Sequence, residues 1–361
     1  MSRRTSRAAG LPDFPWDTLE PAKVRAAAHP GGLVDLSIGT PVDPVAAPIR
    51  QALADASDAP GYPLTVGTPQ LREAMTGYIR AACGATDFGV IPSIGSKELV
   101  AWLPTLLGLG PGDTVVIPSV CYPTYEVGAR LAGARVVRSD EPLDEPAALV
   151  WLNSPGNPHG RVASADELRA WVAWARERGA VIASDECYLS LPWEQTAISV
   201  LHPTISGGSP EGLLAVHSLS KRSNLAGYRA GLVAGDPALV GELLAVRKHA
   251  GMMLPAPVQA AMVAALRDTA HVDEQRARYA ARRISLRAAV EKAGFTVDHS
   301  TAGLYLWLTR GEECWQTLEW FAERGILVAP GAFYGPAGER HVRMALTATD
   351  ERVAAAVDRL T

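Results

Sequence analysis

The feature that most constrains the fold is a regular alternation of helix-like and strand-like segments between about residue 65 and residue 250. Short apolar segments suited to buried strands lie at 114–118, 135–138, 148–152, 181–184, 213–217 and 230–234. Helices are expected at 69–82, 97–107 and 164–178, and the last opens with a capping box formed by Ser164 and Glu167. This alternation predicts an α/β fold whose large domain has a mostly parallel sheet flanked by helices.

The pattern changes after about residue 255. Helices are expected at 257–267, 274–293 and 314–324, and strands at 303–309, 326–329 and 341–346. A chain of 361 residues is long enough for two domains. We therefore expect a large domain that spans 46–250 and a smaller α+β C-terminal domain that spans 251–361. The N-terminal segment, 1–45, is expected to pack with the smaller domain.

The composition argues against several classes of partner. The net charge is −4 and both signs are spread along the chain, so no nucleic-acid partner is expected. The longest apolar stretch is interrupted by Pro104 and is too short to cross a bilayer, so no membrane partner is expected either. Residues 1–7 are basic but no apolar core follows them, which predicts a frayed tail and not a secretory signal.

The cysteines and histidines show no pattern typical of a metal site. The four cysteines lie far apart and form no C-x-x-C pair, which predicts reduced thiols in a cytoplasmic protein. The eight histidines lack any spacing typical of metal ligands, so no metal is expected.

Polar residues follow three of the expected strands. Asp185 follows 181–184, Asn153 and Asn157 follow 148–152, and Ser218 and Lys221 follow 213–217. Ligands of such sheets bind beyond the carboxyl ends of the strands. The sequence therefore predicts that these side chains line one ligand site.

Lys221 has the most specific surroundings of any residue in the chain. Ser218 precedes it, and Arg229 follows it by eight residues. Attack of a lysine amine on an aldehyde needs an uncharged amine, and burial or a cation such as Arg229 lowers a lysine pKa from about 10.4. Ser218 and Arg229 also suit a phosphate. The alternative is a solvated lysine beside a glycine-containing turn.

The segment from Ser218 to Arg229 resembles the cofactor-lysine segment of aminotransferases that use pyridoxal 5′-phosphate. Seven motifs follow the order of that family between residues 37 and 343, so nearly the whole chain resembles the fold-type I, class I/II aminotransferases. The resemblance implies pyridoxal 5′-phosphate as the cofactor of the 46–250 domain. It also implies that Lys221 binds the cofactor aldehyde and moves the substrate proton, and that the enzyme is a homodimer with shared active sites.

Two motifs match the family residues around the cofactor ring. Asp185-Glu-Cys-Tyr188 resembles D-x-x-Y, and residues 153–160 resemble N-x-P-x-N-P-x-G, with His159 where threonine is usual. By resemblance, Asp185 pairs with the ring nitrogen. Tyr188 and Asn157 contact the phenolic oxygen of the ring. The alternatives are that Asp185 caps a turn, that Tyr188 packs on the sheet and that the proline-rich loop is only a turn.

Other motifs match the phosphate site and the ring-stacking residue. Ser96 and the backbone of Lys97 open a helix and match the phosphate cradle, although Ser96 could be an ordinary N-cap. Tyr122 matches the aromatic residue that stacks on the ring, whereas Tyr125 is expected to pack in the core. Tyr62 matches a tyrosine that reaches the phosphate bound by the neighbouring subunit.

The substrate side of the site is also implied by resemblance. Arg343 matches the arginine that binds the substrate α-carboxylate, Asn157 holds part of the same group, and Gly39 matches a glycine that lines the pocket. The loops around Lys221 and Asp185 are most similar to those of succinyldiaminopimelate aminotransferases of lysine biosynthesis.

This narrower similarity implies glutamate as the amino donor and N-succinyl-2-amino-6-oxopimelate as the acceptor. A C–S lyase with the same cofactor and an aminotransferase for another amino acid are the alternatives. The distal end of a dicarboxylate substrate needs a further cation, which could be Arg222, Lys97 or an arginine of the C-terminal domain.

Overall fold

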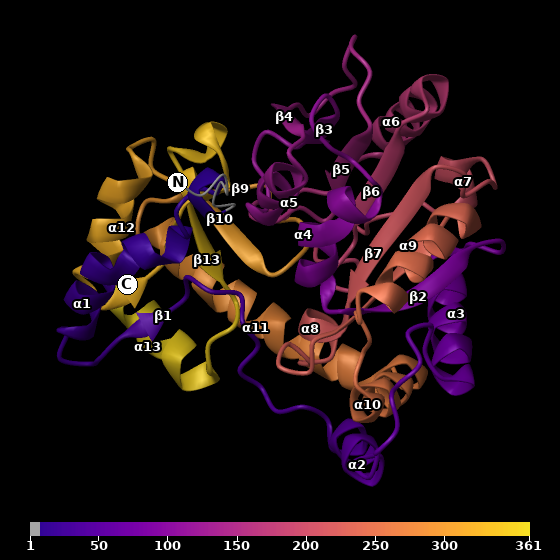
Figure 1. Ribbon diagram of the computed structural model, residues 1–361. Coiled ribbons are helices and arrows are strands. Elements are labelled where there is room, and N and C mark those ends of the chain that lie inside the picture. The colour runs from indigo at the N-terminus through magenta and orange to yellow at the C-terminus, as the bar shows by residue number, and fades with distance from the viewer. Residues whose placement is uncertain (1–7) are drawn as a thin grey trace, which may run out of the picture.

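The computed structural model describes residues 8–361, which form two lobes joined by a long helix (Figure 1). The larger lobe is built on a seven-stranded sheet, and the smaller lobe on a four-stranded antiparallel sheet. The expected α/β fold with a smaller α+β part is therefore present. The tail expected at residues 1–7 lies outside the described residues.

The large sheet has the strand order β2-β8-β7-β6-β5-β3-β4. Its strands are β2 (Gly89–Ile94), β3 (Thr114–Ile117), β4 (Arg135–Arg138), β5 (Leu149–Asn153), β6 (Val181–Asp185), β7 (Leu213–Ser218) and β8 (Ala230–Gly235). All six segments predicted as strands of this sheet are strands. The parallel core consists of β7, β6, β5, β3 and β4.

β8 runs in the opposite direction to its neighbours. It pairs antiparallel with both β7 and β2, so the prediction of a parallel strand at 230–234 is wrong. The physical reason is the connection between β7 and β8, residues 219–229, which holds only the short helix α8 (Leu219–Arg222) and is too short for a crossover. β2 is absent from the sequence prediction because it contains a glycine and a proline, which are rare inside strands.

Helices cover both faces of the large sheet. They are α2 (Ala47–Asp55), α3 (Pro69–Cys83), α4 (Ser96–Leu106), α5 (Thr124–Ala132), α6 (Ala165–Arg178), α7 (Pro203–Ser206), α9 (Pro237–His249) and α10 (Ala256–Arg267). Side chains of α3, α6 and α10 form one hydrophobic core with the sheet, and those of α4, α5 and α9 form another. The capping box of α6 is confirmed, because Ser164 and Glu167 exchange backbone-to-side-chain hydrogen bonds of 3.2 and 2.7 Å.

The smaller lobe combines the N-terminal segment with the C-terminal third of the chain. Its helices are α1 (Glu20–Ala27), α11 (Ala270–Lys292), α12 (Cys314–Ala322) and α13 (Asp350–Leu360). Its strands are β1 (Val34–Asp35), β9 (Thr296–Asp298), β10 (Tyr305–Thr309), β11 (Ile326–Leu327), β12 (Ala329–Pro330) and β13 (Val342–Ala345). Short 3₁₀ helices lie at Ala8–Gly10, Pro15–Leu19, Gly331–Tyr334 and Pro336–Gly338.

The packing of the chain ends bears on the domain boundaries. β1 pairs in parallel with β11, which attaches the N-terminal segment to the smaller lobe. Side chains of α10, by contrast, belong to a core of the large sheet. We propose that the boundary of the smaller domain follows Arg267 and not residue 250. In residues 8–361 no helix is both long and apolar enough to cross a membrane, and all four cysteines are free thiols.

Candidate active site

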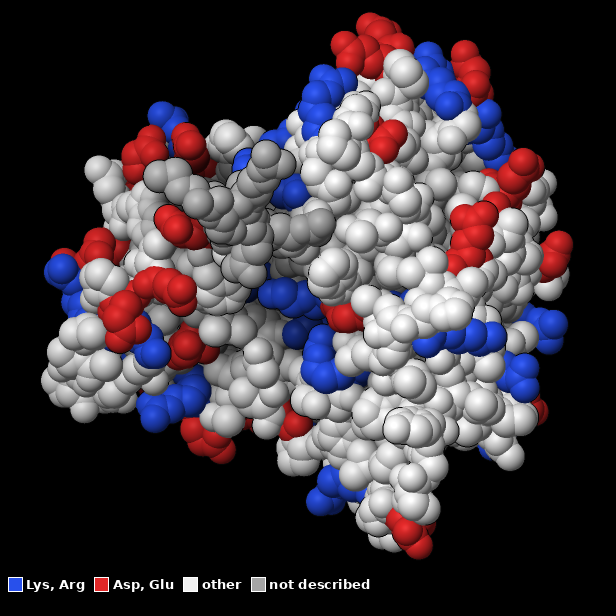
Figure 2. Space-filling view, in the orientation of Figure 1, with Lys and Arg blue, Asp and Glu red and all other residues white. Residues whose placement is uncertain are grey.

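The two lobes enclose a cavity of about 700 Å³. Figure 2 shows basic side chains gathered in the hollow between the lobes. Every site residue predicted from the sequence lines this cavity except Tyr62: Gly39, Ser96, Lys97, Tyr122, Asn157, Asp185, Tyr188, Ser218, Lys221, Arg229 and Arg343. Residues that are far apart in the sequence therefore meet in one place.

The carboxyl ends of the parallel strands position the polar side chains, as expected. Asn153, Asp185 and Ser218 are the last residues of β5, β6 and β7. The amide of Asn153 donates a hydrogen bond of 2.8 Å to the carbonyl of Asp185, and its oxygen accepts one of 2.7 Å from the backbone of Asn157. These bonds join the proline-rich loop rigidly to the end of β6.

Lys221 lies in α8, directly after β7, and its side chain enters the cavity. Its ammonium group donates a hydrogen bond to the carbonyl oxygen of Gly39 in the N-terminal segment. Burial lowers the pKa of Lys221, and the neighbouring cations Arg343 and Arg229 lower it further. The arrangement favours an uncharged amine and rules out the solvated surface lysine.

Asp185 is buried, and both of its carboxylate oxygens accept hydrogen bonds. The hydroxyl of Tyr125 donates to Oδ2 at 2.8 Å, and the backbone N–H of Cys187 donates to Oδ1 at 3.1 Å. The second bond is a turn cap, so the alternative role expected for Asp185 is also fulfilled. Burial raises the pKa of Asp185, and the hydrogen bonds from Cys187 and Tyr125 act in the opposite direction.

The phosphate end of the cavity lies at the start of α4. Gly95 is the N-cap residue of this helix, with a φ of 75°, and no side chain caps its first turn. The interpretation of Ser96 as the N-cap is therefore wrong. A Cβ atom on Gly95 would collide with the guanidinium of Arg229, so only glycine lets that cation approach the helix start. Free N–H groups, Arg229 and Ser218 together fit a phosphate.

Arg343 is buried on the inner wall of the cavity. It donates hydrogen bonds to Asn157 Oδ1 at 3.0 Å and to the carbonyl of Ser37 at 2.6 Å. Its Nε has no hydrogen-bond partner among the described residues. The guanidinium lies 4.0 Å from the ring centroid of Tyr305, which orients its plane. A buried, oriented guanidinium with a free N–H suits a carboxylate.

Several lining residues are absent from the sequence prediction. They include Phe14, Trp16, Ile38, Thr40, Cys187 and Tyr305. The hydroxyls of Tyr305 and Tyr188 lie 3.0 Å apart, so Tyr188 forms a hydrogen bond to the smaller lobe as well as packing beside it. The strand pattern places Tyr305 on a strand but carries no signal for its partner. Phe14 and Trp16 lie outside any expected element, and the sequence offers no signal for them.

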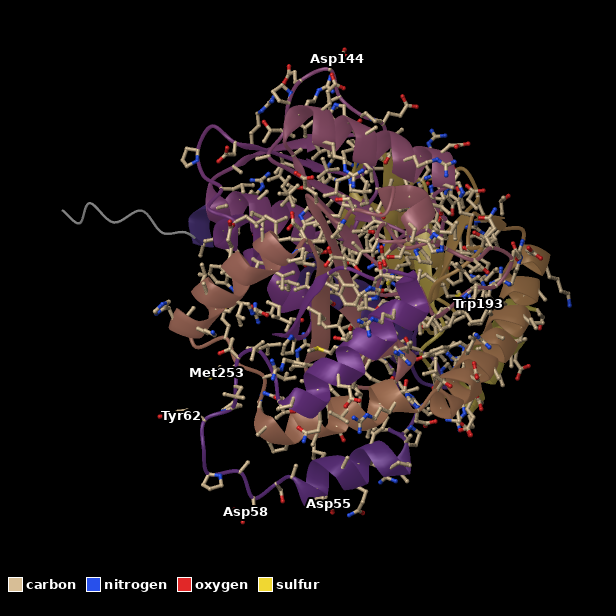
Figure 3. The ribbon with its side chains drawn as sticks, turned by 90° about the vertical axis from the view of Figure 1, so that its right-hand side faces the viewer. Asp55, Asp58, Tyr62, Asp144, Trp193 and Met253 are labelled. Carbon is tan, nitrogen blue, oxygen red and sulfur yellow. The ribbon has the colours of Figure 1, made fainter. Side chains whose placement is uncertain are left out.

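Tyr62 projects from the edge of the large lobe and does not line the cavity of its own chain (Figure 3). Its side chain is 96% exposed. An isolated exposed tyrosine of this kind has no structural role within its own subunit. Its expected contact with a neighbouring subunit remains a prediction.

A separate buried cluster joins Cys83, Glu186 and His217, whose possible ligand atoms lie within 4.8 Å of one another. The distances from His217 Nε2 are 3.6 Å to Cys83 Sγ and 3.4 Å to Glu186 Oε2. Burial lowers the pKa of His217 to about 3 and raises that of Glu186 to about 7. These shifts favour uncharged, hydrogen-bonded side chains, and we assign no metal to the cluster.

Comparison with known proteins gives consistent matches. The sequence profile of the family described as aminotransferase class I and II matches residues 32–360. The 4-dedimethylamino-4-oxo-anhydrotetracycline transaminase OxyQ of Streptomyces rimosus is 62% identical over 97% of this chain and 99% of its own. The probable aminotransferase Rv1178 of Mycobacterium tuberculosis is 63% identical over 98% of this chain and 86% of its own. A solved probable N-succinyldiaminopimelate aminotransferase from Thermus thermophilus superposes with a TM-score of 0.85 at 29% identity, covering 96% of this chain and 99% of that one.

Proposed function

The chain belongs to the class I and II aminotransferases, and we propose that it moves an amino group between glutamate and N-succinyl-2-amino-6-oxopimelate. Its cofactor is pyridoxal 5′-phosphate, and its substrates are amino acids and oxo-acids. The observation that supports the substrate proposal is a pair of cations, Arg343 and Lys97, that line the same cavity. The solved relative named as a probable N-succinyldiaminopimelate aminotransferase supports it further.

The residues of the cavity divide the chemical work between them. Pyridoxal 5′-phosphate supplies an aldehyde that holds the amino group and a ring that accepts electrons released at the substrate α-carbon. Lys221 offers the amine that binds the aldehyde and moves the proton at the α-carbon. Asp185 faces the ring nitrogen, and Arg343 orients the substrate by its α-carboxylate.

Lys97 is the best candidate for the cation that binds the distal carboxylate. Arg343 is buried at the inner wall, whereas Lys97 is exposed where the cavity meets solvent. Arg222 does not line the cavity, is only 5% exposed and stacks on the ring of Tyr78 at 4.7 Å. A dicarboxylate such as glutamate would bind Arg343 at one end and Lys97 at the other.

Aromatic side chains near Lys97 favour a second candidate substrate. The ammonium of Lys97 lies 5.7 Å from the ring centroid of Phe14 and 6.0 Å from that of Tyr122, and Trp16 lines the same cavity. Such a wall suits a flat acceptor, such as the 4-oxo-anhydrotetracycline compound named for the relative in Streptomyces rimosus. A C–S lyase and an aminotransferase for another amino acid are further alternatives.

A panel of acceptors tests the substrate proposal. With glutamate as donor, N-succinyl-2-amino-6-oxopimelate should give the highest kcat/KM among the succinylated acceptor, its unsuccinylated analogue, short oxo-acids and the 4-oxo-anhydrotetracycline compound. Preference for the last compound would replace the proposal with the second candidate. Preference for a short oxo-acid would leave the aminotransferase assignment intact and remove the proposed substrate.

The variant Lys97→Met tests the distal contact. It is expected to lower kcat/KM about tenfold for glutamate and for the succinylated acceptor, because each loses a charge-assisted hydrogen bond. Donors without a distal carboxylate, such as alanine, should be unaffected. Steady-state kinetics with both donors measure the ratio.

Lys248→Met is the matched control, since Lys248 is an exposed lysine of α9 that does not line the cavity. It should leave both donors unchanged. An equal loss with glutamate and alanine in Lys97→Met would show that Lys97 does not bind the distal carboxylate.

We also propose a homodimer whose partners share their active sites. Large hydrophobic side chains are exposed along the segment that leads to Tyr62: Ile38 and Val42 at 47% each and Leu64 at 55%. Exposed apolar side chains grouped in this way are typical of protein interfaces. The exposed phenol of Tyr62 would then reach the phosphate site formed by Ser96 and Arg229 of a second copy.

Hybrid dimers test this proposal. Lys221→Ala and Tyr62→Phe subunits are each expected to be impaired alone. If Tyr62 serves the neighbouring subunit, a hybrid of the two has one intact site, and mixing should restore activity. If Tyr62 serves its own chain, both sites of the hybrid are defective and mixing restores nothing. Sedimentation of the wild-type enzyme as a fully active monomer would also contradict the proposal.

We propose a cytoplasmic location on the basis of the four free cysteines. Three of them, Cys83, Cys121 and Cys314, are buried, which suits thiols that are kept reduced.

A further inference from the structure

We propose that Tyr125 is a positioning residue for the cofactor, acting through Asp185, and not only a packing residue of the core. Its hydroxyl donates a 2.8 Å hydrogen bond to Asp185 Oδ2 in a part of the site closed to solvent. The inference concerns the cofactor and does not depend on which oxo-acid the enzyme accepts.

The surroundings of Tyr125 fix the direction of its hydroxyl. The residue comes from α5 and is fully buried. Its ring stacks on that of Trp151 in β5, with centroids 4.8 Å apart and an angle of 15° between the planes. Its edge meets the ring of Tyr122 at 5.8 Å and 85°. Two aromatic contacts therefore hold the ring, so the phenol is a preorganised donor and not a mobile one.

The hydrogen bond has a definite chemical consequence. Asp185 must remain a carboxylate if the proton that it shares with the cofactor ring nitrogen is to stay on the nitrogen. A donor to the carboxylate stabilises its charged form, whereas burial without donors favours the neutral acid. Burial also holds the pKa of Tyr125 well above its usual value, so the phenol stays protonated and can only donate to Asp185. Without this donor, the shared proton would move toward Asp185 and the ring would accept electrons less well.

Tyr125 also links Asp185 to the residue expected to stack on the cofactor ring. Because Tyr122 packs edge-on against it, one side chain restrains both the counter-charge of the ring nitrogen and the aromatic ring above the cofactor. A purely structural role would require only the ring of Tyr125. A positioning role requires its hydroxyl, and this difference can be measured.

A double-mutant cycle separates the two roles. Apoenzyme affinity for pyridoxal 5′-phosphate and kcat with glutamate are measured for the wild type, Tyr125→Phe, Asp185→Asn and the double variant. In Tyr125→Phe we expect cofactor affinity and kcat each to fall about tenfold, with the KM for glutamate little changed. In the Asp185→Asn background the same substitution should change neither value by more than about twofold, because the charged acceptor is gone.

Two further variants make the test decisive. Tyr125→His keeps an N–H donor on a smaller ring, so it should bind the cofactor more tightly than Tyr125→Phe, although it leaves a larger cavity. Tyr279→Phe removes one hydroxyl from another fully buried tyrosine and should change neither affinity nor kcat. The proposal is overturned if Tyr125→Phe matches the wild type, if its effect persists undiminished in Asp185→Asn, or if Tyr125→His binds the cofactor less tightly than Tyr125→Phe.

Discussion

Replacing Lys221 by alanine is expected to abolish multiple turnover, with kcat falling by several orders of magnitude. Lys221 is held at the carboxyl end of β7 with its amine against the Gly39 carbonyl, and burial lowers its pKa. No neighbouring side chain of the cavity can replace a neutral amine at that point, because Arg229 and Arg343 remain charged. Steady-state assays with glutamate and an oxo-acid measure the loss.

The fold of Lys221→Ala should persist, because Lys221 makes one hydrogen bond and no ion pair among the described residues. Thermal unfolding should therefore begin at a temperature similar to that of the wild type. The exposed Lys248→Ala is the control and should keep its full rate. Near-normal turnover in Lys221→Ala would remove Lys221 from the mechanism.

The second large effect is expected for Asp185→Ala. A buried ionic partner is worth several kcal/mol, so removing the carboxylate should slow the proton-transfer step by about two to four orders of magnitude. The residue also caps its own turn through the Cys187 N–H, so some loss of stability is expected as well, about 1 kcal/mol. Single-turnover kinetics measure the rate, and thermal unfolding measures the stability.

Asp236 provides a matched comparison, because it is an aspartate whose role is capping alone. Its carboxylate accepts hydrogen bonds from the backbone of Ala238 at 2.8 Å and of Gly212 at 2.9 Å, away from the cavity. Asp236→Ala should lose stability and keep its rate, whereas Asp185→Ala should lose its rate chiefly. Two variants with the same profile would mean that capping is the main role of Asp185.

The sequence predicts local features of this fold well and distant contacts poorly. The strand ends at Asn153, Asp185 and Ser218 follow from apolar runs that stop at polar residues, and the capping box of α6 follows from residues three positions apart. The direction of β8 depends instead on how the chain returns after Lys221, which periodicity does not encode. β2 is missed for a related reason, since its pairing with β8 outweighs the weak strand preference of its glycine and proline.

The same distinction holds within the site. Family spacing identifies Lys221, Asp185 and Arg343, since each lies in a recognisable motif. The contact between Tyr125 and Asp185 joins residues 60 positions apart and leaves no local pattern, so the sequence suggests only core packing. Tyr305 and Phe14 reach the cavity from the smaller lobe and the N-terminal segment, and only the packing of the two lobes brings them there.

The most direct test of the central claim is the absorbance of the bound cofactor after glutamate is added to the loaded enzyme. An aminotransferase converts the bound aldehyde stoichiometrically to its amine form and releases 2-oxoglutarate. Addition of N-succinyl-2-amino-6-oxopimelate should then restore the aldehyde absorbance within the same sample. Release of ammonia with an oxo-acid from a sulfur amino acid such as cystathionine, while the cofactor stays in its aldehyde form, would contradict transamination and identify a lyase.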